Sequence, residues 1–178
     1  MFKFVWQVAA VAAGGLALVA CMQNNQPETS APNYQATAAA LAPPANIRAI
    51  CYDESDLGVI RARMVQQQIV VGVLQCKNAD GSRTFDTKYA AFLSKYNPEL
   101  ASNALSLKDV AARKRANVDV LVTEIANRTA NHAQDQLFCS RHQRALEWSL
   151  QPQVTSLAQV PSPLDLGPEM TIFPCPKG

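Results

Sequence analysis

The sequence is poor in the residues from which catalytic and metal sites are usually built. It has two histidines, His132 and His142, which do not have the i, i+4 spacing of a helical zinc site. It contains no G-x-S-x-G, no P-loop and no G-x-G-x-x-G motif. These absences argue against common hydrolases, nucleotide-binding enzymes and zinc enzymes. We therefore expect surface histidines, no catalytic residue, no metal and no cofactor.

Other signals of specific chemistry are also missing. No C-x-x-C is present, which argues against a thioredoxin motif, a zinc knuckle and a c-type haem site. Lys and Arg number 16 against 14 Asp and Glu, a net charge of +2, so we expect no nucleic-acid partner. The run Arg113-Lys114-Arg115 is either a patch for lipid headgroups or an acidic partner, or, as we favour, charge that stabilises a helix C-terminus. The carboxylates are scattered, and no two have a spacing that suggests a general acid and base pair. They include Glu54, Asp86, Glu99, Glu124 and Glu147.

The N-terminus has the layout of a secretory signal peptide. Lys3 precedes an apolar run of 17 residues, from Phe4 to Ala20, which ends in small residues. This run is at the lower limit for crossing a bilayer core of about 30 Å. Simple cleavage after Ala20 is disfavoured because Leu18 stands where such a site prefers a small residue. Residues 1–20 are therefore predicted to be a signal peptide that is not removed by this simple cleavage.

The end of this segment, Leu18-Val19-Ala20-Cys21, resembles the lipobox of bacterial lipoproteins. The resemblance implies cleavage before Cys21 and attachment of acyl chains, such as palmitate, to that residue. Two or more chains anchor a protein stably in a membrane. Met22 in place of Asp favours the outer membrane, facing the periplasm, under the enterobacterial sorting rule. An uncleaved membrane anchor and plain secretion are the alternatives.

Proline marks the expected domain boundaries. Of 11 prolines, four lie between Pro27 and Pro44, six lie between Pro152 and Pro176, and only Pro98 falls in between. Residues 21–46 carry one charge, Glu28, and are predicted to be a disordered tether behind the lipidated cysteine. Residues 47–151 are the expected folded domain, and residues 152–178 a proline-rich, extended tail.

The folded segment has the periodicity of helices and few signals of strands. We expect an all-α, antiparallel four-helix bundle in which Ser55 caps the first helix and Asn97-Pro98 separates the second from the third. The polar stretch 127–132 either kinks or splits the fourth helix. Phe85, Tyr89, Phe92 and Tyr96 form an aromatic stripe that belongs to the core or, less often, lines a ligand pocket. The expected helices cover 56–75, 82–96, 98–115 and 117–148.

The four remaining cysteines are expected to form two disulfides, since export leads to an oxidising compartment. Free buried cysteines are the alternative. Sequence allows three pairings. In an up-down bundle, Cys51 and Cys139 lie at one end, which leaves Cys76 at the other end for Cys175. We therefore favour Cys51–Cys139 with Cys76–Cys175.

Residues 59–107 resemble an uncharacterised family of small exported bacterial proteins. The resemblance covers about a third of the chain and implies an exported, disulfide-bonded helical domain without an established activity. It rests on the segments Arg63-Met64-Val65, Leu74-x-Cys76 and Tyr89-x-x-Phe92-Leu93-x-Lys95-Tyr96-x-Pro98-Glu99-Leu100.

Together these features predict a lipid-anchored envelope protein. We expect a non-enzymatic binding or accessory subunit of another envelope component, because no catalytic constellation accompanies the anchor. A periplasmic small-ligand binder, with the aromatic stripe lining a pocket between helices, is the first alternative. A cell-wall enzyme is the second.

Overall fold

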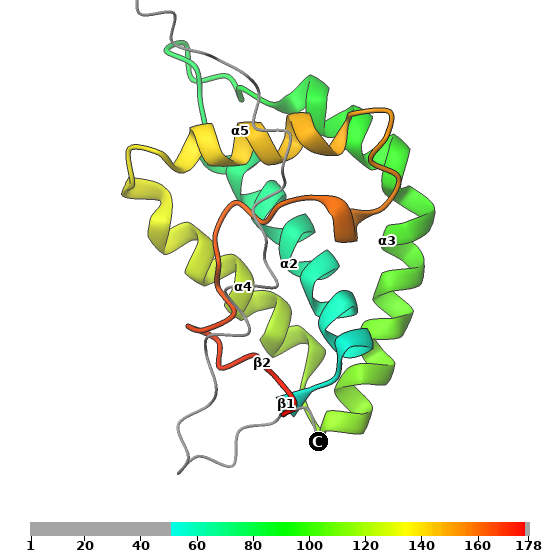
Figure 1. Ribbon diagram of the computed structural model, residues 1–178. Coiled ribbons are helices and arrows are strands. Elements are labelled where there is room, and N and C mark those ends of the chain that lie inside the picture. The colour runs from blue at the N-terminus through cyan, green and yellow to red at the C-terminus, as the bar shows by residue number, and fades with distance from the viewer. Residues whose placement is uncertain (1–50, 177–178) are drawn as a thin grey trace, which may run out of the picture.

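The computed structural model describes residues 51–176, and Figure 1 shows their arrangement. The predicted signal peptide, the lipidation site Cys21 and the predicted tether lie outside these residues. In chain order the elements are β1 (Cys51–Tyr52), α2 (Glu54–Gln75), α3 (Asp86–Lys114), α4 (Val118–Asn131), the 3₁₀ turn η1 (His132–Gln134), α5 (Phe138–Ser149), the 3₁₀ turn η2 (Leu157–Gln159) and β2 (Phe173–Pro174).

Helix α2 is the centre of the fold. It contacts α3, α4 and α5, and the C-terminal tail passes over a further side of it (Figure 1). Apolar residues lie all around α2, which is the pattern of a helix buried on every side. A mostly helical, disulfide-bonded domain is therefore confirmed. The antiparallel four-helix bundle is not, because α5 lies across the end of α2.

Helix α2 begins two residues earlier than predicted. Asp53 is the N-cap, and its carboxylate accepts a hydrogen bond from the backbone N–H of Asp56 at 2.8 Å. The predicted cap, Ser55, lies inside the helix and donates its hydroxyl to Asp53 at 2.7 Å. The carboxylate serves both donors, and these bonds lower the pKa of Asp53.

Helix α3 is one continuous helix, so the predicted break at Asn97-Pro98 is wrong. Pro98 removes one backbone N–H, and the carbonyl of Ser94 thereby loses its helical partner. Both residues are exposed, so water can bond to that carbonyl and the helix continues. The aromatic stripe on α3 belongs to the core, as favoured: Phe92 is 0% and Tyr96 1% exposed.

The disulfides join Cys51 to Cys175 and Cys76 to Cys139. The expectation of two disulfides is confirmed, but the pairing Cys51–Cys139 with Cys76–Cys175 is wrong. Because α3 replaces two predicted helices, the chain reverses direction once less, and α4 runs back toward the end where α2 finishes (Figure 1). The chain then turns at residues 132–137, which brings Cys139 beside Cys76.

The tail packs along α2 and returns to where α2 begins. It buries several apolar side chains, and β2 pairs in parallel with β1 beside the Cys51–Cys175 disulfide. At the same end, the buried Asp56 carboxylate accepts from Arg113 at 2.5 Å and lies 3.4 Å from the ammonium of Lys114. Two members of the basic run thus hold α3 to α2. The buried tail residues include Val154, Leu157, Val160, Leu164 and Leu166.

Gly72 is required where α5 crosses α2. A Cβ added there would lie 2.6–2.7 Å from atoms of the His142 side chain, closer than real Cβ atoms approach. We expect Gly72→Ala to lower the free energy of unfolding by about 1–3 kcal/mol through overpacking. Gly58→Ala is the matched control, since nothing lies within 4 Å of that Cβ, and helix propensity should raise stability by about 0.5–1 kcal/mol. Urea unfolding measures both, and equal effects would contradict the close contact.

Candidate functional site

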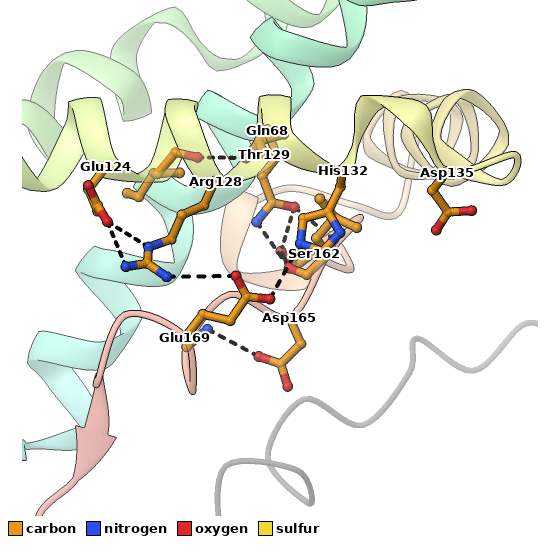
Figure 2. A network of polar contacts seen from close by, with 12 residues as sticks. Gln68, Glu124, Arg128, Thr129, His132, Asp135, Ser162, Asp165 and Glu169 are labelled. Atoms are coloured by element: carbon orange, nitrogen blue, oxygen red, sulfur yellow. Dashed lines mark hydrogen bonds and ion pairs between the residues drawn. The ribbon is translucent and has the colours of Figure 1, made fainter.

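Charged side chains gather where the tail crosses α4 (Figure 2). Arg128 lies within 2.6 Å of Glu124, one turn earlier on α4, and within 3.8 Å of Glu169 on the tail. His132 follows at the end of α4, and its Nε2 lies 3.3 Å from the same Glu169 carboxylate. We call these four residues the α4–tail cluster.

The α4–tail cluster lies near the surface. Its side chains are 33–43% exposed, and ion pairs in such positions contribute about 0–1 kcal/mol each. The cluster therefore positions the tail beside α4 without supplying much of the stability. Its two carboxylates, Glu124 and Glu169, both contact Arg128.

Beneath the cluster, Gln68 of α2 fixes the tail by buried hydrogen bonds (Figure 2). Its side-chain oxygen accepts from the N–H of Leu164 at 2.8 Å, and its amide nitrogen donates to the carbonyl of Leu164 at 3.0 Å. Ser162 also donates its hydroxyl to Gln68 at 3.1 Å. Gln68 is fully buried, so one side chain satisfies both backbone groups of a tail residue that water cannot reach.

The other carboxylates singled out in the sequence each have a different partner. Glu54 pairs with Arg61, Glu147 pairs with Lys88, and Asp86 lies 3.8 Å from Arg83. Glu99 instead accepts from the hydroxyl of Ser156 at 2.8 Å and from the backbone N–H of Leu157 at 2.9 Å, which fixes η2 on α3. Glu147 and Glu99 thus link segments that are far apart in the chain, and Glu54 and Asp86 contact residues of their own segment.

The part of the chain that the structure describes contains no group of side chains that could bind a metal ion. Within residues 51–176, no three His, Cys, Asp or Glu side chains are grouped to hold an ion. His132 and His142 lie on different elements, and each has its own contacts.

His142 is buried, so the expectation of a surface histidine is wrong for this residue. It is 1% exposed and lies over Gly72 at the α2–α5 crossing. Its Nδ1 lies 2.7 Å from the carbonyl oxygen of Phe138, which can only accept, so Nδ1 carries the proton. Nε2 has no hydrogen-bond partner within the described residues. Burial lowers the pKa of His142, which favours the neutral ring.

A small apolar pocket lies between α2 and the tail. Its volume of about 20 Å³, counted as space open to the centre of a water molecule, suits one or two waters or the end of one side chain. Sites for small ligands are typically about 300–1,000 Å³. The α2–tail pocket is lined by Leu57, Ile60, Arg61, Met64, Asp165, Gly167, Pro168, Ile172, Phe173 and Pro174, and by none of the aromatic stripe.

None of the helices between residues 51 and 176 combines the length and the hydropathy that crossing a bilayer requires.

No protein-family model, no curated protein and no solved structure matches this chain. The resemblances to lipoproteins and to a family of exported proteins therefore stay predictions. Gln68 and the α4–tail cluster were not anticipated from the sequence. The burial of His142 has a signal in the sequence, because Phe138, Ala145 and Leu146 place it on the apolar face of α5.

Gln68 is expected to matter more than the surface cluster. Gln68→Met leaves the N–H of Leu164 buried without a partner, while its C=O keeps the hydrogen bond from the Ser162 hydroxyl at 2.8 Å. This change should lower the free energy of unfolding by about 1–3 kcal/mol. Glu169→Gln weakens only exposed ion pairs and should cost less than about 1 kcal/mol. Denaturant unfolding of both variants measures these two losses of free energy. A larger loss in Glu169→Gln than in Gln68→Met would contradict the prediction.

His142 makes stability depend on pH in the acidic range. Its pKa is lowered in the folded protein, so the unfolded chain binds the proton more readily. Its contribution is therefore complete above the unfolded pKa of about 6.5 and is lost as pH falls below that value. We expect the loss of unfolding free energy between pH 7 and pH 5 to be smaller in His142→Asn than in the native chain. Equal pH dependence in both proteins would show that His142 does not titrate on unfolding.

Proposed function

We propose that this chain is a lipid-anchored protein of the bacterial cell envelope that serves as a non-enzymatic binding or accessory subunit of another envelope component. It is exported by residues 1–20, cleaved before Cys21 and held at the membrane, most readily the outer membrane, by acyl chains on that residue. The domain then faces the periplasm at the end of the tether formed by residues 21–46.

The distribution of the cysteines carries this proposal. The structure pairs Cys51 with Cys175 and Cys76 with Cys139, so four of the five cysteines are used within the folded domain. Such disulfides are characteristic of exported proteins. The fifth cysteine, Cys21, follows the apolar segment in the context Leu18-Val19-Ala20. An odd cysteine in an exported protein calls for a partner or a modification, and a lipid at this position provides one.

The accessory role is supported by how the domain uses its polar side chains. The α4–tail cluster, Gln68 and Glu99 each hold the tail against the helices. The aromatic stripe on α3 is in the core, and the α2–tail pocket is far smaller than a typical ligand site. These observations favour a binding surface over an enclosed ligand or a catalytic centre.

Cys21→Ala should release the protein from the membrane. We expect the native chain to be labelled by a palmitate analogue and to fractionate with the envelope, and Cys21→Ala to lose both properties. Met22→Ala is the matched control and should remain labelled, because it keeps the modified cysteine. In-cell crosslinking followed by mass spectrometry should recover specific envelope proteins with the native chain and not with Cys21→Ala.

Two results would count against the proposal. If Cys21→Ala fractionates with the envelope as fully as the native chain, the lipid is not the anchor. If the lipidated chain crosslinks to no envelope protein, the accessory role fails while the anchor stands.

A further inference from the structure

The tail is fixed on both sides of residues 167–172, which we call the strap. On one side, Leu166 is buried in the core at 0% exposed. On the other side, Phe173 begins β2, and the Cys51–Cys175 disulfide follows two residues later. The strap is therefore a short length of chain that is held at its two ends.

Between these two ends the strap makes few strong contacts. Each side chain of residues 168–172 is half-buried or exposed. The N–H groups of residues 170–172 donate to the carbonyls of residues 166–168, so these hydrogen bonds stay within one turn of the tail. Glu169 joins the strap to the α4–tail cluster through exposed ion pairs, which contribute little stability. The strap is thus held to the helices less firmly than the parts of the tail on either side of it.

Packing beneath the strap is incomplete. The α2–tail pocket, with a volume of about 20 Å³, lies between α2 and the strap. Pro168 and Ile172 line it from the strap, and Leu57, Ile60 and Met64 line it from α2. Atoms that border such a space lack contacts on one side, so the strap gains less dispersion energy here than a tightly packed segment would.

Thr171 has a backbone conformation that is unfavourable for its residue type. Its φ is 54°, in the left-handed region, where a β-branched residue is an outlier. Its N–H donates to the carbonyl of Pro168 at 3.2 Å, and the N–H of the next residue, Ile172, donates to the carbonyl of Gly167 at 2.9 Å. These are the bonds of a Schellman motif, whose left-handed position is usually a glycine. The closed strap therefore carries strain at Thr171 that opening would release.

We propose that the strap is a flap that opens and closes as a local unit, while Leu166 and the Cys51–Cys175 disulfide hold its two ends. Opening releases the strain at Thr171, and it breaks exposed ion pairs and hydrogen bonds that are confined to one turn. It also uncovers an apolar side of α2, so the flap controls access to that surface. This inference does not depend on the lipid anchor. The α2 residues uncovered, each at most 3% exposed when the strap is closed, are Leu57, Ile60 and Met64.

Hydrogen exchange resolved to single amides, measured on the full chain, tests the flap. In the native chain, the amides of residues 170–172 should exchange at least a hundredfold faster than the slowest amides of α2, because local opening costs less free energy than global unfolding. After correction for intrinsic rates, Thr171→Gly should slow these three amides about tenfold, since glycine adopts the left-handed conformation without the strain.

Two control variants separate local opening from global unfolding. Arg115, the C-cap of α3, also has a positive φ, of 53°, so Arg115→Gly makes the same kind of change outside the strap. It should alter the exchange of residues 170–172 less than twofold. Gly72→Ala, which destabilises the whole domain, should speed the slowest amides of α2 and leave the rates of residues 170–172 unchanged.

Several outcomes would overturn the proposal. If residues 170–172 exchange as slowly as the slowest amides of α2, or if Gly72→Ala speeds both sets equally, the strap opens only when the domain unfolds. If residues 170–172 exchange at the rate of an unstructured peptide, the strap has no closed state. If Thr171→Gly leaves their rates unchanged, or Arg115→Gly slows them as much, the strain at Thr171 does not act on the opening.

Discussion

The burial of α2 on all sides is the constraint on which the rest of the structure depends. Helices α3, α4 and α5 each pack against α2, and the tail covers a further side of it. The two disulfides lie at the two ends of this helix: Cys51 precedes it and binds the end of the tail, and Cys76 follows it and binds α5. The elements that arrive last in the chain are thus linked covalently to the element that forms the centre.

The sequence predicts individual helices better than it predicts their direction. The periodicity of 56–75 locates α2 to within two residues, and the aromatic stripe is correctly assigned to the core. The rule that proline begins a helix fails at Pro98, because the carbonyl that loses its partner is exposed to water. That single local error reverses the direction expected for α4, and the disulfide pairing derived from it is wrong for the same reason.

The candidate site could not be predicted because its contacts join residues far apart in the chain. Gln68 bonds to Leu164, and neither residue carries a motif. Arg128, His132 and Glu169 are ordinary surface residues until the tail crosses α4. His142 differs: its apolar helix face is visible in the sequence, but its contact with Gly72 depends on how α5 crosses α2. Periodicity shows which face of a helix is buried, and the partner of that face comes from the fold.

Four of the five cysteines form the two disulfides of the domain, and we propose that the fifth, Cys21, carries the membrane anchor. Non-reducing peptide mapping by mass spectrometry, on protein purified from bacterial membranes, tests this division directly. We predict peptides linking Cys51 to Cys175 and Cys76 to Cys139, and an N-terminal peptide that begins at Cys21 and carries the mass of acyl chains. A free thiol or a disulfide at Cys21, or either of the other two pairings, would contradict it.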